Sequence, residues 1–145
     1  MAMKETYHLY VDADVNYNHG RYRDEPTNAN RIPLAPTFTS TGGITYRTAG
    51  GLSSALRYRA LDARPANEAN TIKALGYGLF DVVASYTQKR YLVGFTIENL
   101  LNRNWNQAQF ATQSRLPNEG PDGVDELHYT PGTPFYLKGN VSVFF

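Results

Sequence analysis

Tyr-His-Leu-Tyr-Val-Asp-Ala-Asp-Val-Asn-Tyr, residues 7–17, alternates between two kinds of side chain. Every odd-numbered position is apolar or aromatic, whereas the acidic residues Asp12 and Asp14 occupy even-numbered positions. Successive side chains of a β-strand point to opposite faces of its sheet, so a period of two predicts a strand with two chemically different faces. Helical spacing fits this stretch less well.

The same alternation recurs in five further segments, at 37–47, 52–62, 76–86, 91–101 and 135–145. Six segments of about 11 residues place about 45% of the chain in strands, against roughly 20–25% in an average globular domain. Each segment is nearly twice the usual strand length of about 5–6 residues. A tilted strand of about 9–11 residues is long enough to cross the hydrocarbon core of a membrane. The sequence therefore predicts an all-β fold, an antiparallel meander of about six long strands.

The connections between these segments alternate in length. Residues 48–51 and 87–90 form short connections, whereas 18–36, 63–75 and 102–134 form long ones. Outer-membrane barrels have short periplasmic turns and longer extracellular loops. On that pattern the six strands form part of a large outer-membrane barrel, and the last strand ends at the periplasmic side with Phe145.

Aromatic residues on the apolar face gather at the strand ends, where such barrels carry aromatic girdles. With the orientation above, one girdle at the periplasmic membrane interface consists of Tyr7, Tyr46, Tyr86, Tyr91 and Phe145. The opposite ends of the strands carry Tyr17, Phe38, Tyr58 and Phe135. The other face holds the charged side chains, and its candidates for facing the barrel lumen are Arg57, Arg59, Asp81 and Glu98.

An alternative architecture explains the same alternation. In a small self-contained β-barrel or sandwich the apolar face is a core and the charged face is in water. Such a protein would bind an apolar ligand in its interior, as soluble lipid carriers do. The two architectures place the apolar face oppositely, against lipid in one and inside the protein in the other.

Composition and motifs exclude several classes of protein. A formal charge of +1 argues against a nucleic-acid binder, and zero cysteines exclude disulfide scaffolds, thiol catalysis and iron–sulfur clusters. No apolar run approaches the roughly 18 residues of a membrane helix. The three histidines, His8, His19 and His128, are scattered, and no phosphate-binding glycine loop, zinc helix or nucleophile elbow occurs. We expect no catalytic activity, no metal and no cofactor.

The opening Met-Ala-Met is followed at once by Lys4 and Glu5, which does not fit a signal peptide. The chain is then cytoplasmic, already processed, or a piece of a longer protein.

The long segment 102–134 contains Pro117, Pro121 and Pro131 and shows no alternation of its charges. Because proline cannot donate to a central ladder, we expect an extracellular loop, with 109–115 and 125–130 able to form a hairpin above the membrane.

Several stretches in the second half of the chain resemble the last strands of TonB-dependent outer-membrane receptors. They are Leu56-Arg57-Tyr58-Arg59, Gly76-Tyr77 to Asp81 with Tyr86, and above all Glu98-Asn99-Leu100-Leu101-Asn102-Arg103-Asn104-Trp105-Asn106. The last of these is similar to an ENLxxxxY/W segment that these receptors carry near the end of their barrel. Residues 108–110, 114–116 and 126–134 and the aromatic C-terminus are similar to a subgroup of the family.

This resemblance implies a barrel of about 22 strands filled by an N-terminal plug. It implies uptake of a scarce nutrient, such as a ferric siderophore, cobalamin or a sugar, across the outer membrane of a Gram-negative bacterium. Residues 1–145 would be its C-terminal barrel segment, and the plug and roughly the first sixteen strands would be missing. The partners would be outer-membrane lipid, the missing plug and strands and, through the plug alone, an energy-coupling protein. The isolated segment would self-associate.

Val141, Val143 and Phe145 fit the alternating apolar pattern with a terminal aromatic residue that the assembly machinery of such barrels reads. The family often has glycine five residues before the end, where this chain has Asn140 beside Gly139. Trp105 is predicted to be an interface anchor or a residue that packs within a loop.

Overall fold

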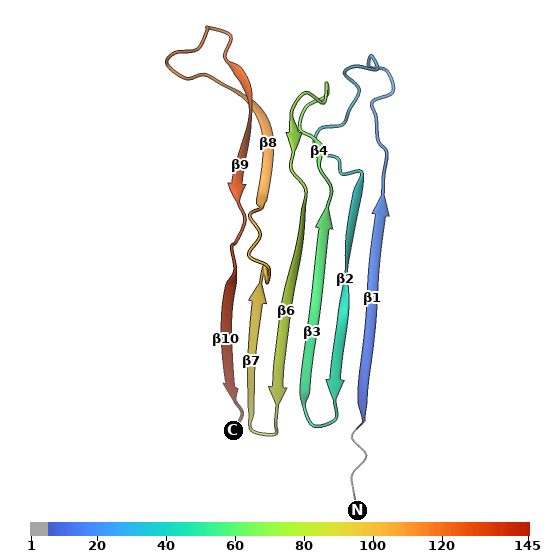
Figure 1. The fold of residues 1–145 in the computed structure, drawn as a ribbon, viewed down its shortest axis with the longest axis vertical. Coiled ribbons are helices and arrows are strands. Elements are labelled where there is room, and N and C mark those ends of the chain that lie inside the picture. Colours follow the sequence, from blue (N-terminus) through green and yellow to red (C-terminus); the bar gives the residue numbers. More distant parts are fainter. Residues whose placement is uncertain (1–5) are drawn as a thin grey trace, which may run out of the picture.

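The fold is all-β. The computed structural model describes residues 6–145, in which no helix is assigned, so the expectations that rest on the opening residues lie outside the described range. Six strands form one antiparallel sheet in the order β1-β2-β3-β6-β7-β10 (Figure 1). Their bounds are β1 Tyr7–Tyr17, β2 Phe38–Thr48, β3 Leu52–Leu61, β6 Tyr77–Thr87, β7 Tyr91–Glu98 and β10 Tyr136–Val143. The predicted antiparallel meander is confirmed.

Two small hairpins lie at one end of this sheet. Strands β4 (Arg64–Pro65) and β5 (Lys73–Ala74) pair within the second long connection, and β8 (Asn106–Ser114) and β9 (Val124–Pro131) pair within the third. Figure 1 shows β8 and β9 beyond the upper ends of β7 and β10. The segment 102–134 thus contains the hairpin that the sequence allowed, and its strands are not members of the six-stranded sheet.

Several strand ends differ from the periodic segments by one to three residues. The alternation extends the fifth segment to residue 101, whereas β7 ends at Glu98. The reason is Asn99, whose backbone φ of 51° leaves the extended region and turns the chain. Residue 135 is also outside its expected strand, because Phe135 precedes the first paired residue of β10.

The register aligns residues of one kind across all six strands. One row of cross-strand partners is wholly apolar: Val11, Ile44, Leu56, Val82, Ile97 and Leu137. The next row, one residue along, contains Asp12, Gly43, Arg57 and Asp81. Since neighbouring residues of a strand face opposite ways, the sheet has one apolar and one charged face.

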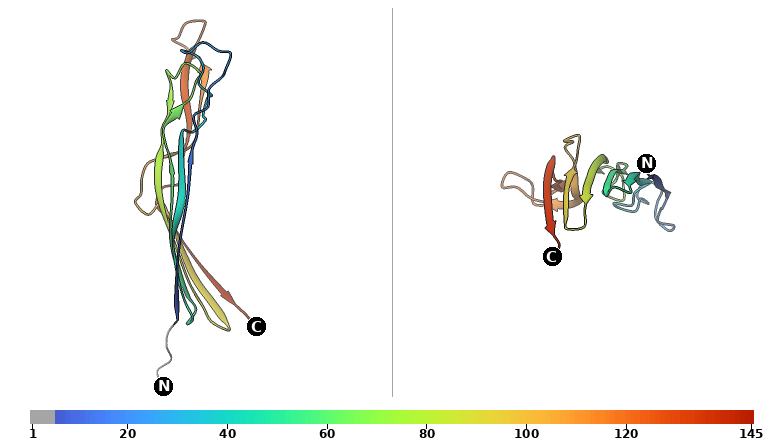
Figure 2. Two further views of the ribbon diagram at one scale, coloured as in Figure 1. Left: turned by 90° about the vertical axis from the view of Figure 1, so that its right-hand side faces the viewer. Right: turned by 90° about the horizontal axis from the view of Figure 1, so that it is seen from below.

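Within the described residues, no second layer covers either face of the six-stranded sheet. Figure 2 shows the sheet as a single twisted layer of strands. The accessible surface is 10700 Å², against about 7,500 Å² for a typical folded monomer of 16.2 kDa. Among residues 6–145 the buried hydrophobic side chains are Ala66, Ala74 and Leu79 alone. The strands are therefore held together by their ladders and neighbouring side chains, without a hydrophobic core.

Candidate functional site

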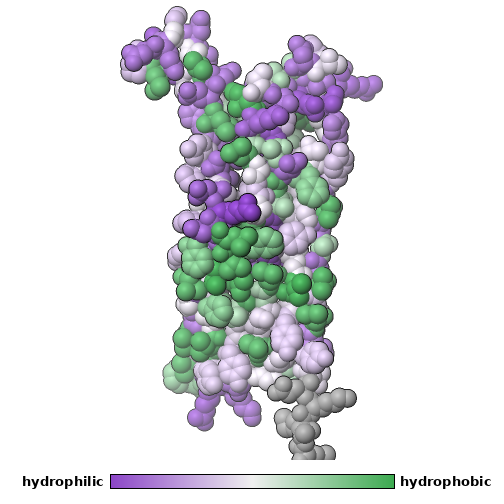
Figure 3. Space-filling model, in the orientation of Figure 1, coloured by the Kyte–Doolittle hydropathy of each residue, from purple (hydrophilic) through white to green (hydrophobic). Residues whose placement is uncertain are grey.

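The apolar face forms a band of exposed hydrophobic side chains. Val11 is 72% exposed and Ile44 is 47% exposed, although both lie in the middle of long, regularly paired strands. In Figure 3, hydrophobic residues cross the sheet as a band, and hydrophilic residues gather over the long connections. Within the described part of the chain no helix is long and apolar enough to cross a membrane.

The residues predicted as an aromatic girdle lie near the end of the sheet that carries the two short turns, which we call the short-turn end. Tyr7 and Tyr46 lie on adjacent strands with ring centroids 6.2 Å apart. Tyr86 and Tyr91 flank the turn between β6 and β7, with ring centroids 6.4 Å apart. Phe145 lies two residues beyond β10 and is fully exposed. The structure thus brings the girdle residues to one end of the sheet.

Two of the predicted assembly residues continue the apolar face to the last strand. Val141 pairs with Val93, and Val143 pairs with Tyr91. The chain end is also tied to the short-turn end, since the Phe144 amide donates to the Arg90 carbonyl at 2.8 Å. The outer edge of β10 has no partner strand among residues 6–145.

The charged face joins the predicted lumen residues into ion pairs. Arg57 Nη1 lies 2.5 Å from Asp12 Oδ1, although strand β2 lies between β3 and β1 and places one residue position between the two side chains. That position is Gly43, and a Cβ there would lie 2.8 Å from Arg57 Cδ. The missing side chain is what lets the arginine extend over β2. Sequence reasoning placed Asp12 on this face but did not identify it as the partner of Arg57.

The other three lumen candidates lie near one another on the same face, beginning with Asp81 directly opposite Arg57. Arg59 Nε is 3.7 Å from Asp81 Oδ2, and Glu98 Oε1 is 2.6 Å from Lys138 Nζ. The Arg59 guanidinium carbon also lies 5.3 Å from the centroid of the Trp105 ring, in cation–π geometry. Each of the four predicted residues therefore has an oppositely charged neighbour within the sheet.

Asn99 anchors the point where β7 ends and is only 1% exposed. Its backbone N–H donates to Asp81 Oδ1 at 2.8 Å. Its carboxamide donates from Nδ2 to the carbonyls of Arg103 (2.8 Å) and Thr133 (3.1 Å) and accepts at Oδ1 from the Arg103 amide (2.9 Å). One side chain thus joins the end of β7 to the segments that precede β8 and β10. The sequence places this asparagine in the ENL segment but indicates no role for it.

Trp105 packs within the loops, as one of the two sequence expectations for it stated. Its Nε1 donates to the Thr133 carbonyl at 2.9 Å, and its ring meets Tyr77 edge-on with centroids 4.9 Å apart. Gly132 lies directly against the indole, where any Cβ would overlap the ring atoms. Together Asn99 and Trp105 fix the base of the β8–β9 hairpin through the same carbonyl, that of Thr133.

Gln109 attaches the hairpin to the preceding long connection. It is 3% exposed and forms a closed pair of hydrogen bonds with the Leu75 backbone. Leu75 N donates to Gln109 Oε1, and Gln109 Nε2 donates to Leu75 O, both at 2.8 Å. The Gln109 carboxamide therefore pairs with the Leu75 backbone through one donor and one acceptor, as the backbone of a neighbouring strand would.

We expect Gln109→Glu to release the hairpin from this attachment. The substitution keeps the shape but replaces the donor to the Leu75 carbonyl by an oxygen, which costs about 1–3 kcal/mol for a buried group. Hydrogen exchange at the Leu75 amide should accelerate while exchange in β6 and β7 stays slow. Gln113→Glu is the matched control, because Gln113 is exposed and its bond to the Asp122 carbonyl lies at the hairpin tip. Equal acceleration in both variants would contradict the role given to Gln109.

The first and second long connections are also joined to each other. The Arg31 amide donates to the Glu68 carbonyl at 3.1 Å, and the Leu34 amide donates to the Pro65 carbonyl at 2.7 Å. With the Gln109 pair, all three long connections form one hydrogen-bonded assembly at the end of the sheet opposite the short turns. Among the described residues, no group of three or more His, Cys, Asp or Glu side chains is arranged to hold a metal ion.

No protein-family model, no curated protein and no solved structure matches this chain.

Proposed function

We propose that the chain is the C-terminal barrel segment of a TonB-dependent outer-membrane receptor, a transport protein that takes up a nutrient and has no catalytic activity. The observation that carries this proposal is the uncovered apolar band of the six-stranded sheet. A water-soluble monomer rarely exposes a large contiguous apolar patch, whereas a membrane barrel presents such a band to lipid.

The dimensions of the sheet support the proposal. Strands β1, β2 and β6 have 11 residues each, which at about 3.3 Å per residue is more than enough to cross roughly 25 Å of apolar band at a tilt of about 35–45°. The girdle residues at the short-turn end would lie at the periplasmic interface. The joined long connections would lie outside the cell, over the substrate entrance.

The free edges of the sheet also support membership in a larger barrel. Strands β1 and β10 form the two edges and do not pair with each other. Six strands are too few to enclose a plug, because even about eight strands make a barrel filled by its own side chains. Strands supplied by a longer chain would complete both edges, and the ion pairs of the charged face would then line the lumen beside the plug.

The alternative of a small apolar-ligand carrier has less support. It requires an enclosed interior lined by the apolar face, but in residues 6–145 that face is open to the outside and no strand covers it. The position of Asn99 adds to the receptor proposal. The ENL segment that resembles the family contains a buried asparagine that fixes three parts of the chain, which is a physical reason for asparagine at that position.

The experiment that tests the proposal has two parts. The DNA upstream of Met1 should continue in frame and encode a plug and further strands. The full-length product should sediment with outer membranes, withstand a carbonate wash that removes peripheral proteins, and enter solution only with detergent. By contrast, the 145-residue chain alone should self-associate through its free edges in plain buffer. A monodisperse monomer in plain buffer would overturn the proposal.

A further inference from the structure

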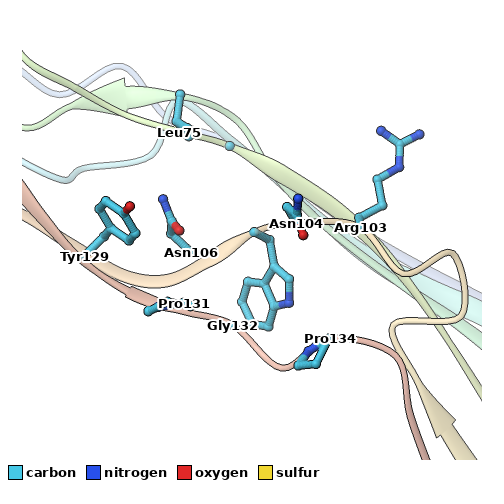
Figure 4. Close-up of a pocket in the computed structure, with 10 residues that line it drawn as sticks. Leu75, Arg103, Asn104, Asn106, Tyr129, Pro131, Gly132 and Pro134 are labelled. Carbon is cyan, nitrogen blue, oxygen red and sulfur yellow. The ribbon is translucent and has the colours of Figure 1, made fainter.

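A cleft of about 320 Å³ opens where β7 ends and β8 begins. Its volume lies at the lower end of the roughly 300–1,000 Å³ that small-molecule sites occupy. One wall is the Leu75–Gly76 segment that precedes β6, and the other is the base of the β8–β9 hairpin (Figure 4). The cleft lies among the long connections, at the end of the sheet opposite the short turns.

The asparagines of this region divide into two groups. Asn99 and Asn102 are used by the fold, since Asn99 holds Arg103 and Thr133 and the Asn102 Oδ1 accepts from the Phe135 amide at 2.9 Å. Asn104 and Asn106 line the cleft instead, and within residues 6–145 their carboxamides make no side-chain hydrogen bond. Among the same residues the Tyr129 hydroxyl has no hydrogen-bond partner either. Figure 4 shows Asn106 and Tyr129 on the hairpin wall of the cleft, across from Leu75.

The remaining lining is apolar and carries little charge. Leu75, Trp105, Pro131 and Pro134 supply carbon surface. Arg103 is the single charged residue among those that line the cleft, and in Figure 4 its side chain extends away from the hairpin wall. An anionic ligand would be recognised by paired cations or bidentate arginine, which this arrangement does not provide.

We propose that this cleft binds a neutral, hydroxyl-rich solute of the size of a sugar ring. A hydroxyl both donates and accepts, so a carboxamide with its own donor and acceptor can pair with two neighbouring hydroxyls. The C–H faces of a sugar ring would pack on Leu75 and on the proline surfaces, because both faces of the Trp105 ring are occupied, by Gly132 and by Arg59. This inference rests on the proposed function, because it assigns a saccharide as the nutrient class that the receptor takes up.

The single tryptophan of the chain, Trp105, lines the cleft and therefore reports its occupancy. The full 145-residue chain in phosphocholine micelles, which carry no sugar headgroup, is titrated with maltose, cellobiose and citrate at constant ionic strength while Trp105 emission is recorded. We expect a saturable change with at least one disaccharide and none with citrate. Tyr129→Phe removes one hydroxyl and should weaken the binding about fivefold to tenfold, and Asn106→Ala removes a donor and an acceptor and should weaken it at least as much.

Asn118→Ala is the matched control, since Asn118 lies at the exposed hairpin tip away from the cleft. Asn106 belongs to β8, so Asn106→Ala could disturb the strand and reduce the far-UV signal of β-structure. In that case Asn104→Ala is used instead, because Asn104 lies outside any strand. No saturable response to either disaccharide, a response to citrate instead, or equal affinities in Asn106→Ala and Asn118→Ala would each overturn the saccharide assignment. Membrane fractionation is measured separately. If the protein fractionates with outer membranes but binds neither disaccharide, the saccharide assignment is wrong and the proposed receptor function stands.

Discussion

Ile44→Arg should abolish insertion of the full-length protein into the outer membrane. Ile44 lies near the middle of β2, in the apolar row that runs across all six strands. In the proposed barrel its side chain points into lipid near the bilayer midplane. An arginine on the lipid face at that depth costs about 2–4 kcal/mol. The measurement is the amount of the variant that remains in carbonate-washed outer membranes.

Two control variants separate lipid contact from ordinary packing. Thr45→Arg changes the adjacent residue, which faces the charged side of the sheet among Tyr10 and Ala55, so insertion should be retained. Leu52→Arg lies on the apolar face at the short-turn end, where the cost falls to about 0–1 kcal/mol near the membrane interface.

Because the cost of an arginine on a lipid face depends on its depth in the bilayer, the barrel orientation predicts a much larger loss for Ile44→Arg than for Leu52→Arg. Equal losses in the two variants would contradict that orientation. Loss of insertion in Thr45→Arg would show that the two faces have been exchanged.

Local patterns were sufficient to predict the strands. A period of two is a property of each segment by itself, and the six predicted segments differ from the observed strands by at most three residues at any end. The largest difference, at the end of β7, has a cause that local pattern does not contain. The turn at Asn99 is held by Asp81 of another strand and by Thr133, 34 positions further along the chain.

The contacts of the candidate site could be predicted only in part. Alternation placed Arg57 and Asp81 on one face, but the pair of Arg57 with Asp12 depends on the register that sets Gly43 between them. Likewise, the attachment of Gln109 to Leu75 joins two connections that carry no periodic signal. Such contacts follow from strand register and loop docking, which are long-range properties of the chain.

Asn99→Asp should detach the hairpin base more severely than any other substitution of similar size. The two side chains have the same shape, and both tolerate the left-handed backbone that Asn99 adopts. The introduced carboxylate still accepts from the Arg103 amide, but it presents an oxygen, instead of an N–H donor, to the Arg103 and Thr133 carbonyls. The Arg103 carbonyl loses its side-chain donor, which costs about 1–3 kcal/mol for a buried acceptor, and the Thr133 carbonyl keeps only its bond from Trp105. The buried charge adds to that loss.

Trp105 emission measures the detachment, because its indole donates to the same Thr133 carbonyl. In micelles the emission should shift to the red while the far-UV signal of the sheet persists. Acidification should reverse part of the shift, since a protonated carboxyl regains one donor.

Asn102→Asp is the matched control for this substitution. Asn102 has the same left-handed backbone, with φ 48°, but it is exposed and its one side-chain bond uses the oxygen that aspartate keeps. We expect its emission to match that of the unchanged chain. If Asn102→Asp shifts the emission as far as Asn99→Asp does, then charge near the loop is the cause, and the carboxamide of Asn99 does not hold the three segments together.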